Sequence, residues 1–228
     1  VGGVYYAPDL ASLDSGALAY TEDDGAVAMD GDATVTDGDS ADFDTGTLTV
    51  TIASGGDVAE DVLSIENEGT GSGQIGVSGS NVSYAGTTIG TFTGGSSGSA
   101  LVITLDSDAT PTEAQALVRK ITYENTDVSA PTIGARGVTF VLTDGDGGTS
   151  ATDTVTVTVS AVNDAPVLGS LDGGTVAYAE GDGAVAMDAD ATVADVDSAD
   201  FDTGTLTVTV ASGGDVAEDV LSIVNEGT

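Results

Sequence analysis

Short runs in which apolar and polar residues alternate recur along the chain, and they predict β-strands. A period of two places successive side chains on opposite faces, so one face of each run can join a core. Residues 154–159, Thr-Val-Thr-Val-Thr-Val, alternate most regularly. In residues 47–52, Leu48, Val50 and Ile52 are expected to face inward. Further strands are predicted as two strands and a turn in 17–36, around Leu63 and Ile65, and at 74–77, 81–84, 87–92, 101–105 and 138–142.

A single helix is predicted to begin after Thr110. The run Thr110-Pro-Thr-Glu113 offers an N-cap threonine, a proline at the first helical position and the glutamate of a capping box. The helix is expected to run to about Lys120, so that Arg119 and Lys120 lie in its last turn, where cations suit the helix dipole. With Arg136 these are the three cations of the chain, and we interpret them as local structural partners. The predicted buried face holds Ala114, Leu117, Val118 and Ile121.

These elements predict an all-β fold. The expected architecture is an antiparallel Greek-key β-sandwich, because Val, Thr and Ile dominate the runs and turn residues separate them. The short helix would lie in an inserted segment within residues 69–125.

An internal repeat with an offset of 158 residues organises the chain. Residues 42–70 and 200–228 are identical except at Ile52/Val210 and Glu66/Val224. We therefore expect residues 1–158 to form one complete repeat and residues 159–228 to form the first part of a second, incomplete one. The second repeat is expected either to belong to a longer array or to be completed by strands from another chain. Left alone, a strand at 205–210 would expose its backbone and an apolar face.

The chain is strongly acidic, and this excludes several classes of function. It has 38 Asp and Glu against 3 Lys and Arg, a formal charge of −35, with no His, Cys or Trp. Such a charge repels nucleic acids and anionic membranes. Disulfides and thiolate metal sites are excluded, and no apolar run is long enough for membrane insertion. The first residue is Val1, so we expect a processed form or a fragment.

No enzymatic activity is expected. The serines have no histidine to serve as a base, and the 6 Tyr and 4 Phe are few for a sugar-cleaving cleft.

Clusters of carboxylates indicate a hard cation, and we expect Ca²⁺, which takes six to eight oxygen ligands. The alternative is that Asp-Gly pairs are ordinary turn residues. Asp57, Glu60 and Asp61 are expected to form a solvated face. The candidate ligands are Glu22, Asp37, Asp39, Asp42, Asp144, Asp146, Asn163 and Asp164, with Glu180, Asp195, Asp197 and Asp200 in the second copy.

The start of the first repeat differs from the start of the second. Tyr5 and Tyr6 stand where the second copy has Asn163 and Asp164. Since tyrosine is a poor calcium ligand, no calcium is expected at the start of the first repeat, which fits a terminal, capping repeat.

The run from Asp144 to Pro166, which includes the Val162-Asn-Asp-Ala-Pro166 joint, resembles the end of a cadherin-like repeat and its calcium-binding linker. Tyr178-Ala-Glu180 and Asp195-Val-Asp197 are similar to the acidic motifs of such repeats. The likeness is greatest to long repeats of giant bacterial surface proteins and adhesins. It implies linker calcium bound jointly by Glu22, Asp144 and Asp146 before the joint, Asn163 and Asp164 within it, and Asp195 and Asp197 after it.

We therefore expect an extracellular or cell-surface structural module, rigidified by Ca²⁺, in a bacterial adhesin, sheath or filament. Its partners would be other copies of the repeat or of the same chain. One alternative is a filament subunit completed by strand exchange between chains. Another is an adhesin module that binds a surface glycan or protein through residues 69–105, with Tyr84 and Phe92 as contacts.

Overall fold

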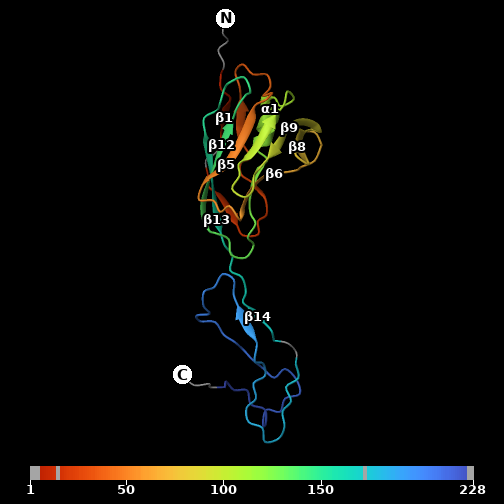
Figure 1. Cartoon of the computed structure of the whole chain (residues 1–228), viewed down its shortest axis with the longest axis vertical. Coiled ribbons are helices and arrows are strands. Elements are labelled where there is room, and N and C mark those ends of the chain that lie inside the picture. The colour runs from red at the N-terminus through yellow and green to blue at the C-terminus, as the bar shows by residue number, and fades with distance from the viewer. Residues whose placement is uncertain (1–5, 14–15, 172–173, 225–228) are drawn as a thin grey trace. The chain divides into compact units, whose positions relative to one another are not determined.

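The computed structural model describes residues 6–13, 16–171 and 174–224 of the chain (Figure 1). The chain divides into two compact units, Val1–Val162 (unit 1) and Asn163–Thr228 (unit 2). The last strand of unit 1 extends to Ser160, two residues beyond the boundary expected from the repeat.

Unit 1 is built on an eight-stranded sheet. The long β5 lies in its middle, because it pairs with β12 on one side and with β10 on the other, and β12 forms a hairpin with β13. All pairs are antiparallel except β13–β2. The order is β2 (Leu18–Thr21), β13 (Asp153–Ser160), β12 (Gly134–Leu142), β5 (Thr47–Ser54), β10 (Leu101–Leu105), β9 (Thr87–Thr93), β8 (Asn81–Tyr84) and β7 (Ile75–Ser78).

Two smaller antiparallel sheets complete the strands of unit 1. The first is β3 (Val27–Ala28), β11 (Ile121–Asn125) and β6 (Asp61–Ile65), with β11 in the middle. The second pairs β1 (Asp9–Ala11) with β4 (Thr34–Thr36). The sequence did not predict β1 or β11, and residues 17–36 hold three short strands, β2, β3 and β4, instead of two.

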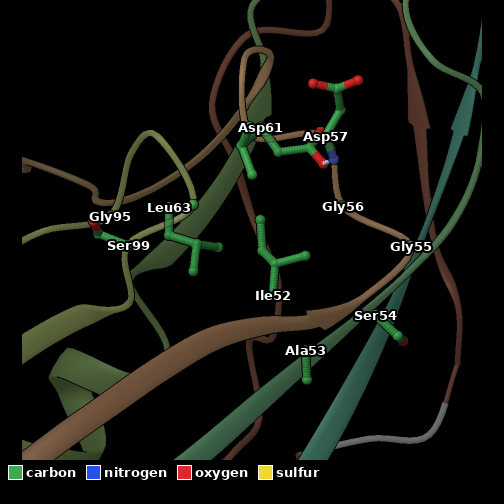
Figure 2. A pocket seen from close by; sticks show the side chains of 12 residues that line it. Ile52, Ala53, Ser54, Gly55, Gly56, Asp57, Asp61, Leu63, Gly95 and Ser99 are labelled. Atoms are coloured by element: carbon green, nitrogen blue, oxygen red, sulfur yellow. Dashed lines mark hydrogen bonds between the residues drawn. The ribbon is translucent and has the colours of Figure 1, made fainter.

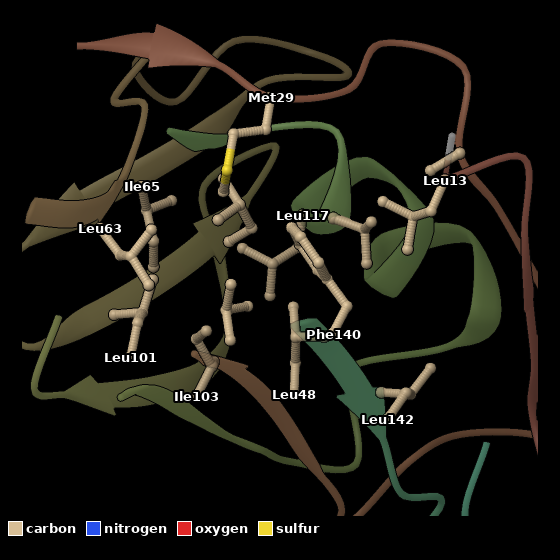
Figure 3. Packing of buried hydrophobic residues seen from close by; sticks show 14 of the residues in the cluster. Leu13, Met29, Leu48, Leu63, Ile65, Leu101, Ile103, Leu117, Phe140 and Leu142 are labelled. Carbon is tan, nitrogen blue, oxygen red and sulfur yellow. The ribbon is translucent and has the colours of Figure 1, made fainter. Parts of the chain in front are cut away.

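One hydrophobic core joins the sheets and the helix (Figure 3). Leu48 and Val50 of β5 are buried as predicted, while Ile52 is only partly buried at the edge of the core. Leu63 and Ile65 of β6 lie on the same side of the cluster as Leu101 in Figure 3. The chain is therefore an all-β fold of mostly antiparallel sheets with one short helix, and its architecture is sandwich-like.

The predicted helix is present as α1 (Pro111–Val118). The Thr110 hydroxyl accepts the amide of Thr112, so Thr110 is the N-cap that the sequence predicted. The Glu113 carboxylate accepts the Thr110 hydroxyl, whereas a capping box would have it accept the Thr110 amide. Ala114, Leu117 and Val118 are buried.

The predicted end of the helix is wrong by two residues. Arg119 is the C-cap, Lys120 lies outside the helix, and Ile121 is buried as the first residue of β11. Both basic residues instead make tertiary contacts beyond the helix. Arg119 Nε donates to Ala33 O at 2.7 Å, and Lys120 Nζ contacts the carboxylates of Glu66 and Glu68. Arg119 and Lys120 are thus structural partners, as predicted.

The expectation that Asp61 belongs to a solvated face is also wrong. Asp61 is 4% exposed, and its Oδ2 lies 2.9 Å from Nε of the buried Arg136. Its Oδ1 accepts the hydroxyl of Tyr123 at 2.5 Å and the amide of Asn125 at 3.1 Å. A guanidinium in the core requires a buried carboxylate partner, which fixes Asp61 inside. Burial, together with the hydrogen bond to Asp61, raises the pKa of Tyr123.

Unit 2 is mostly loop (Figure 1). Among its described residues the strands are β14 (Val167–Gly169) and β15 (Thr192–Ala194), which pair with each other. Residues 205–210, predicted as a strand, form no ladder in the described part of the chain. Their side chains Leu206, Val208 and Val210 are 76%, 52% and 50% exposed, which is the exposed apolar face that the sequence predicted.

Candidate functional site

The loop after β4 carries three of the predicted ligands, Asp37, Asp39 and Asp42. Asp37 Oδ1 accepts the amides of Asp39 at 3.0 Å and Ser40 at 2.8 Å. Although burial raises the pKa of Asp37, these donors outweigh it and lower the pKa below the ordinary value. The stability that Asp37 contributes is therefore present above the ordinary pKa and is lost as the pH falls through the lowered one.

A backbone contact ties the start of each unit to this loop. The amide of Tyr6 donates to Asp39 Oδ1 at 3.1 Å. The amide of Asp164 donates to Asp197 Oδ2 at 3.1 Å, which is the same contact 158 residues later. Tyr5 lies outside the described residues. The two copies therefore share a device that fixes where the chain enters the unit.

Asp144 closes the turn between β12 and β13. It is 1% exposed, and its carboxylate accepts the amides of Asp146, Gly147 and Gly148 at 2.8–3.1 Å. The turn packs near the chain start, since a Cβ added to Gly148 would lie 2.6 Å from the Tyr6 carbonyl oxygen. Asp144 thus acts as a turn residue, the alternative that the sequence left open, and Asp146 is exposed beside it.

The grouping of Asp144 and Asp146 with the linker is wrong. Both lie at the turn of the β12/β13 hairpin, whereas the linker leaves from its open end, after Ser160. The eight residues of β13 separate the two ends, a span of about 26 Å at ~3.3 Å per residue. Asp144 and Asp146 lie instead at the end of unit 1 that holds Tyr6.

Glu22 lies at the linker end of unit 1. It follows β2, whose last residue Thr21 pairs with Ser160, and its own amide donates to Ser160 O at 2.9 Å. Glu22 is buried, with 6% of the residue exposed. Its Oε2 accepts the amide of Val162 at 2.8 Å, but Oε1 is buried without a hydrogen-bond partner. A buried carboxylate oxygen with no partner is costly, and a cation would satisfy it.

The predicted ligands of unit 2 occupy turns as well. Asp195 Oδ1 accepts the amides of Asp197 and Ser198, and Asp200 Oδ1 accepts that of Asp202. Burial raises the pKa of Asp195, yet these donors lower it below the ordinary value. Asp164 Oδ2 is buried without a partner, whereas Glu180 is exposed. Asn163 Nδ2 donates to Asp164 O at 2.5 Å.

The predicted ligands are thus spread over separate places. Asp37, Asp39, Asp42, Asp144 and Asp146 lie in loops at the Tyr6 end of unit 1, and Glu22 lies at the other end. Across the described ranges, no group of three or more carboxylates converges closely enough to hold a metal by itself. Backbone carbonyls and water would have to supply most ligands of any Ca²⁺ there.

The Asp61 cluster is the buried polar site that the sequence analysis missed. The signal was available, since Asp61 lies two residues before Leu63 and four before Ile65, on the inward face of the same alternation. The cluster borders a cavity of about 250 Å³ whose walls include Ile52 and Leu63 (Figure 2). Asp61 Oδ2 also accepts the Asp57 amide at 2.7 Å, so both of its oxygens are engaged and neither is left for a ligand.

The aromatic residues proposed for glycan binding are partly buried. Tyr84 and Phe92 pack against the hydrophobic core.

No known protein family, curated protein sequence or solved structure matches the chain. In the described part of the chain, no helix has the length and apolar character needed to cross a membrane.

Proposed function

We propose that the chain is a structural module of an extracellular bacterial surface array, an adhesin stalk, sheath or filament. In this proposal the repeat is a cadherin-like, Greek-key β-sandwich, and Ca²⁺ rigidifies the joint that follows it. The repeat itself supports a role in which similar units follow one another. The shared Tyr6–Asp39 and Asp164–Asp197 contacts support it further, because both copies fix their incoming chain in the same way.

The observation that carries the proposal is Glu22. Its carboxylate holds the backbone of Val162, the last residue of unit 1, and keeps one buried oxygen without a partner. Asn163 and Asp164 follow Val162 directly in the sequence and add further oxygens. Ca²⁺ would neutralise these groups and fix the backbone as it leaves unit 1. The charge of −35 favours cation binding and explains why the joint would loosen without it.

Thermal unfolding with and without calcium tests the proposal. Binding to the folded chain alone raises stability by about 2.7 kcal/mol at a hundredfold excess over Kd. We expect Ca²⁺ to raise the melting temperature and chelation to reverse the change. The Glu22→Gln variant should lose most of the calcium-dependent shift.

The matched control is Asp108→Asn, which removes one exposed charge far from the linker in sequence. It should keep the full shift. Equal melting temperatures in calcium and in chelator, or an unchanged shift in Glu22→Gln, would contradict the proposal.

A further inference from the structure

The strand pairing of unit 1 divides the repeat into two halves that depend on each other. We call residues 1–70 the first half and residues 71–158 the second half. From the first half, β2 pairs with β13, β3 and β6 pair with β11, and β5 pairs with β10 and β12. Within the described part of the first half, only β1 and β4 pair with each other. Four of its six strands therefore need partners from the second half.

Unit 2 has the sequence of a first half, and it keeps only the pair that a first half can form alone. Its ladder β14–β15 aligns Leu168 with Val193, as β1–β4 aligns Leu10 with Val35. The segments that correspond to β2, β3, β5 and β6 have no ladder in the described residues. The sequence of these segments is nearly unchanged, so what they lack is the partner strands.

A cavity in unit 2 lies where unit 1 holds β11. Its volume is about 600 Å³, and its walls include Val185, Met187 and residues 219–222. Moved back by 158 residues, these walls are Val27 of β3, Met29 just after it, and residues 61–64 of β6. In unit 1, β11 lies between those two strands and pairs with both. The cavity is therefore a slot for one extended segment.

A second cavity exposes apolar side chains that unit 1 buries. It measures about 500 Å³, and most of its lining is apolar. In unit 1 the second half covers the corresponding face; for example, Phe43 donates its amide to Ala109 O. Leu168, Val193, Phe201 and Leu206 are 52%, 53%, 47% and 76% exposed, whereas their counterparts Leu10, Val35, Phe43 and Leu48 are 7%, 4%, 0% and 1% exposed.

The second half is also acidic, with 8 Asp and Glu against 3 Lys and Arg, but its cations pair with groups of the first half. Residues 1–70 carry 16 acidic residues and residues 159–228 carry 14, and neither stretch contains Lys or Arg. All three cations lie in the second half, and each binds a group of the first half: Arg136 binds Asp61, Lys120 binds Glu66 and Glu68, and Arg119 binds Ala33 O. Asp219 repeats the bond of Asp61 to the amide four residues earlier, but no cation of its own unit can pair with it.

We propose that unit 2 is an acceptor for a polypeptide with the sequence of the second half, residues 71–158, supplied in addition to the copy that unit 1 already uses. The segment Ile121–Asn125 of the incoming polypeptide fills the slot beside residues 219–222. Its β10-like and β12-like strands pair with residues 205–210, and its Arg136 pairs with Asp219. This inference does not rest on calcium, because none of these contacts involves a metal.

Strand exchange among copies of residues 1–228 alone does not provide the partner. This stretch carries two first halves and one second half. If unit 2 of one chain takes the second half of another, the first half of that other chain loses its strands. The number of first halves without a second half therefore stays the same. Exchange buries no additional apolar surface, and association costs translational and rotational entropy.

The test adds a separate polypeptide of residues 71–158 to the full chain in the presence of chelator. We expect a 1:1 complex by sedimentation, and slow amide hydrogen exchange at 205–210 and 219–223, which should exchange fast in the free chain. Asp219→Asn should weaken binding at least tenfold, since it leaves a buried arginine without its charged partner. Asp202→Asn, which also removes one exposed charge of unit 2, should bind like the unmodified chain.

Three results would overturn the inference: unit 2 amides that stay fast in the complex, equal affinities of the two variants, or the same protection in the chain alone at high concentration. The last would make a second copy the occupant. If the separate polypeptide does not stay in solution, the same sequence is attached after Thr228. Fast exchange at 205–210 in that extended chain would equally refute the acceptor.

Discussion

At the residue scale, most of the grouped aspartates use an oxygen to bind backbone amides of their own turns. One carboxylate oxygen accepts the amides two and three residues ahead, which stabilises a tight turn without a ligand. This use explains much of the aspartate content of a strand-rich chain, which needs many turns. The aspartates with this pattern include Asp30, Asp37, Asp127, Asp144, Asp188 and Asp195.

The Asp61–Arg136 pair gives a prediction at this scale. Asp61→Ala leaves the Arg136 guanidinium buried without a carboxylate, and breaking such a pair costs about 3–5 kcal/mol. We expect a loss of that size in the free energy of unfolding of unit 1, measured by urea titration. The chain supplies its own control, because Asp219 is the same residue in unit 2, is exposed and lacks an arginine. Asp219→Ala should change stability by at most ~0.5 kcal/mol, and equal losses would refute the assignment.

At the scale of elements, the alternating strands were predictable and the central strand β11 was not. In β13, buried valines alternate with exposed threonines, so the sequence itself shows the period of two that indicates a strand. In β11, Ile121, Thr122 and Tyr123 are all buried, because β3 and β6 flank it and the Thr122 hydroxyl bonds Ser64 at 2.6 Å. A strand buried on all sides has no alternation to detect.

The candidate site residues likewise divide into features that the sequence predicts and features that it does not. The carboxylate clusters were visible in the sequence because each is local. Which of them lie together depends on strand register, as the separation of Asp144 from the linker shows. The partnerless oxygen of Glu22 depends on the meeting of β2 with the end of β13, 140 residues away, and no local pattern encodes it.

Helix α1 provides the prediction for an element. Its N-cap was read from the sequence and is formed by the Thr110 hydroxyl. Thr110→Ala should cost about 1 kcal/mol of unit 1 stability, because an amide and the Glu113 carboxylate lose their partner. Thr112→Ala changes an exposed threonine within the same turn and should cost clearly less. A urea midpoint for Thr110→Ala no lower than that for Thr112→Ala would show that the cap does not stabilise the helix.

At the scale of the whole molecule, the cations lie in the half of the repeat whose strands pair with those of the other, purely acidic half. The first half of the repeat is purely acidic, and the second half holds the cations that it binds. A first half without a second half therefore lacks both its strands and its counter-charges. Self-repulsion in unit 2 opposes collapse of its exposed apolar side chains, which is consistent with a single short ladder in its described part.

Unit 1 should be independent of unit 2 in stability. Every strand pair of unit 1 lies within residues 9–160, so a chain that ends at Val162 retains all of its ladders and its core. The 14 carboxylates that are lost with residues 163–228 are screened beyond about 8 Å at physiological salt. We expect the shortened chain to unfold in chelator with a free energy within ~0.5 kcal/mol of that of unit 1 in the full chain. Urea titrations followed by the near-ultraviolet signal of the buried Tyr20 and Tyr123 measure this directly. Both rings belong to unit 1, and they pack edge to face with their centroids 5.1 Å apart. A loss of several kcal/mol on removal of residues 163–228 would mean that unit 2 supports the core of unit 1, and the division of the chain at Val162 would then be wrong.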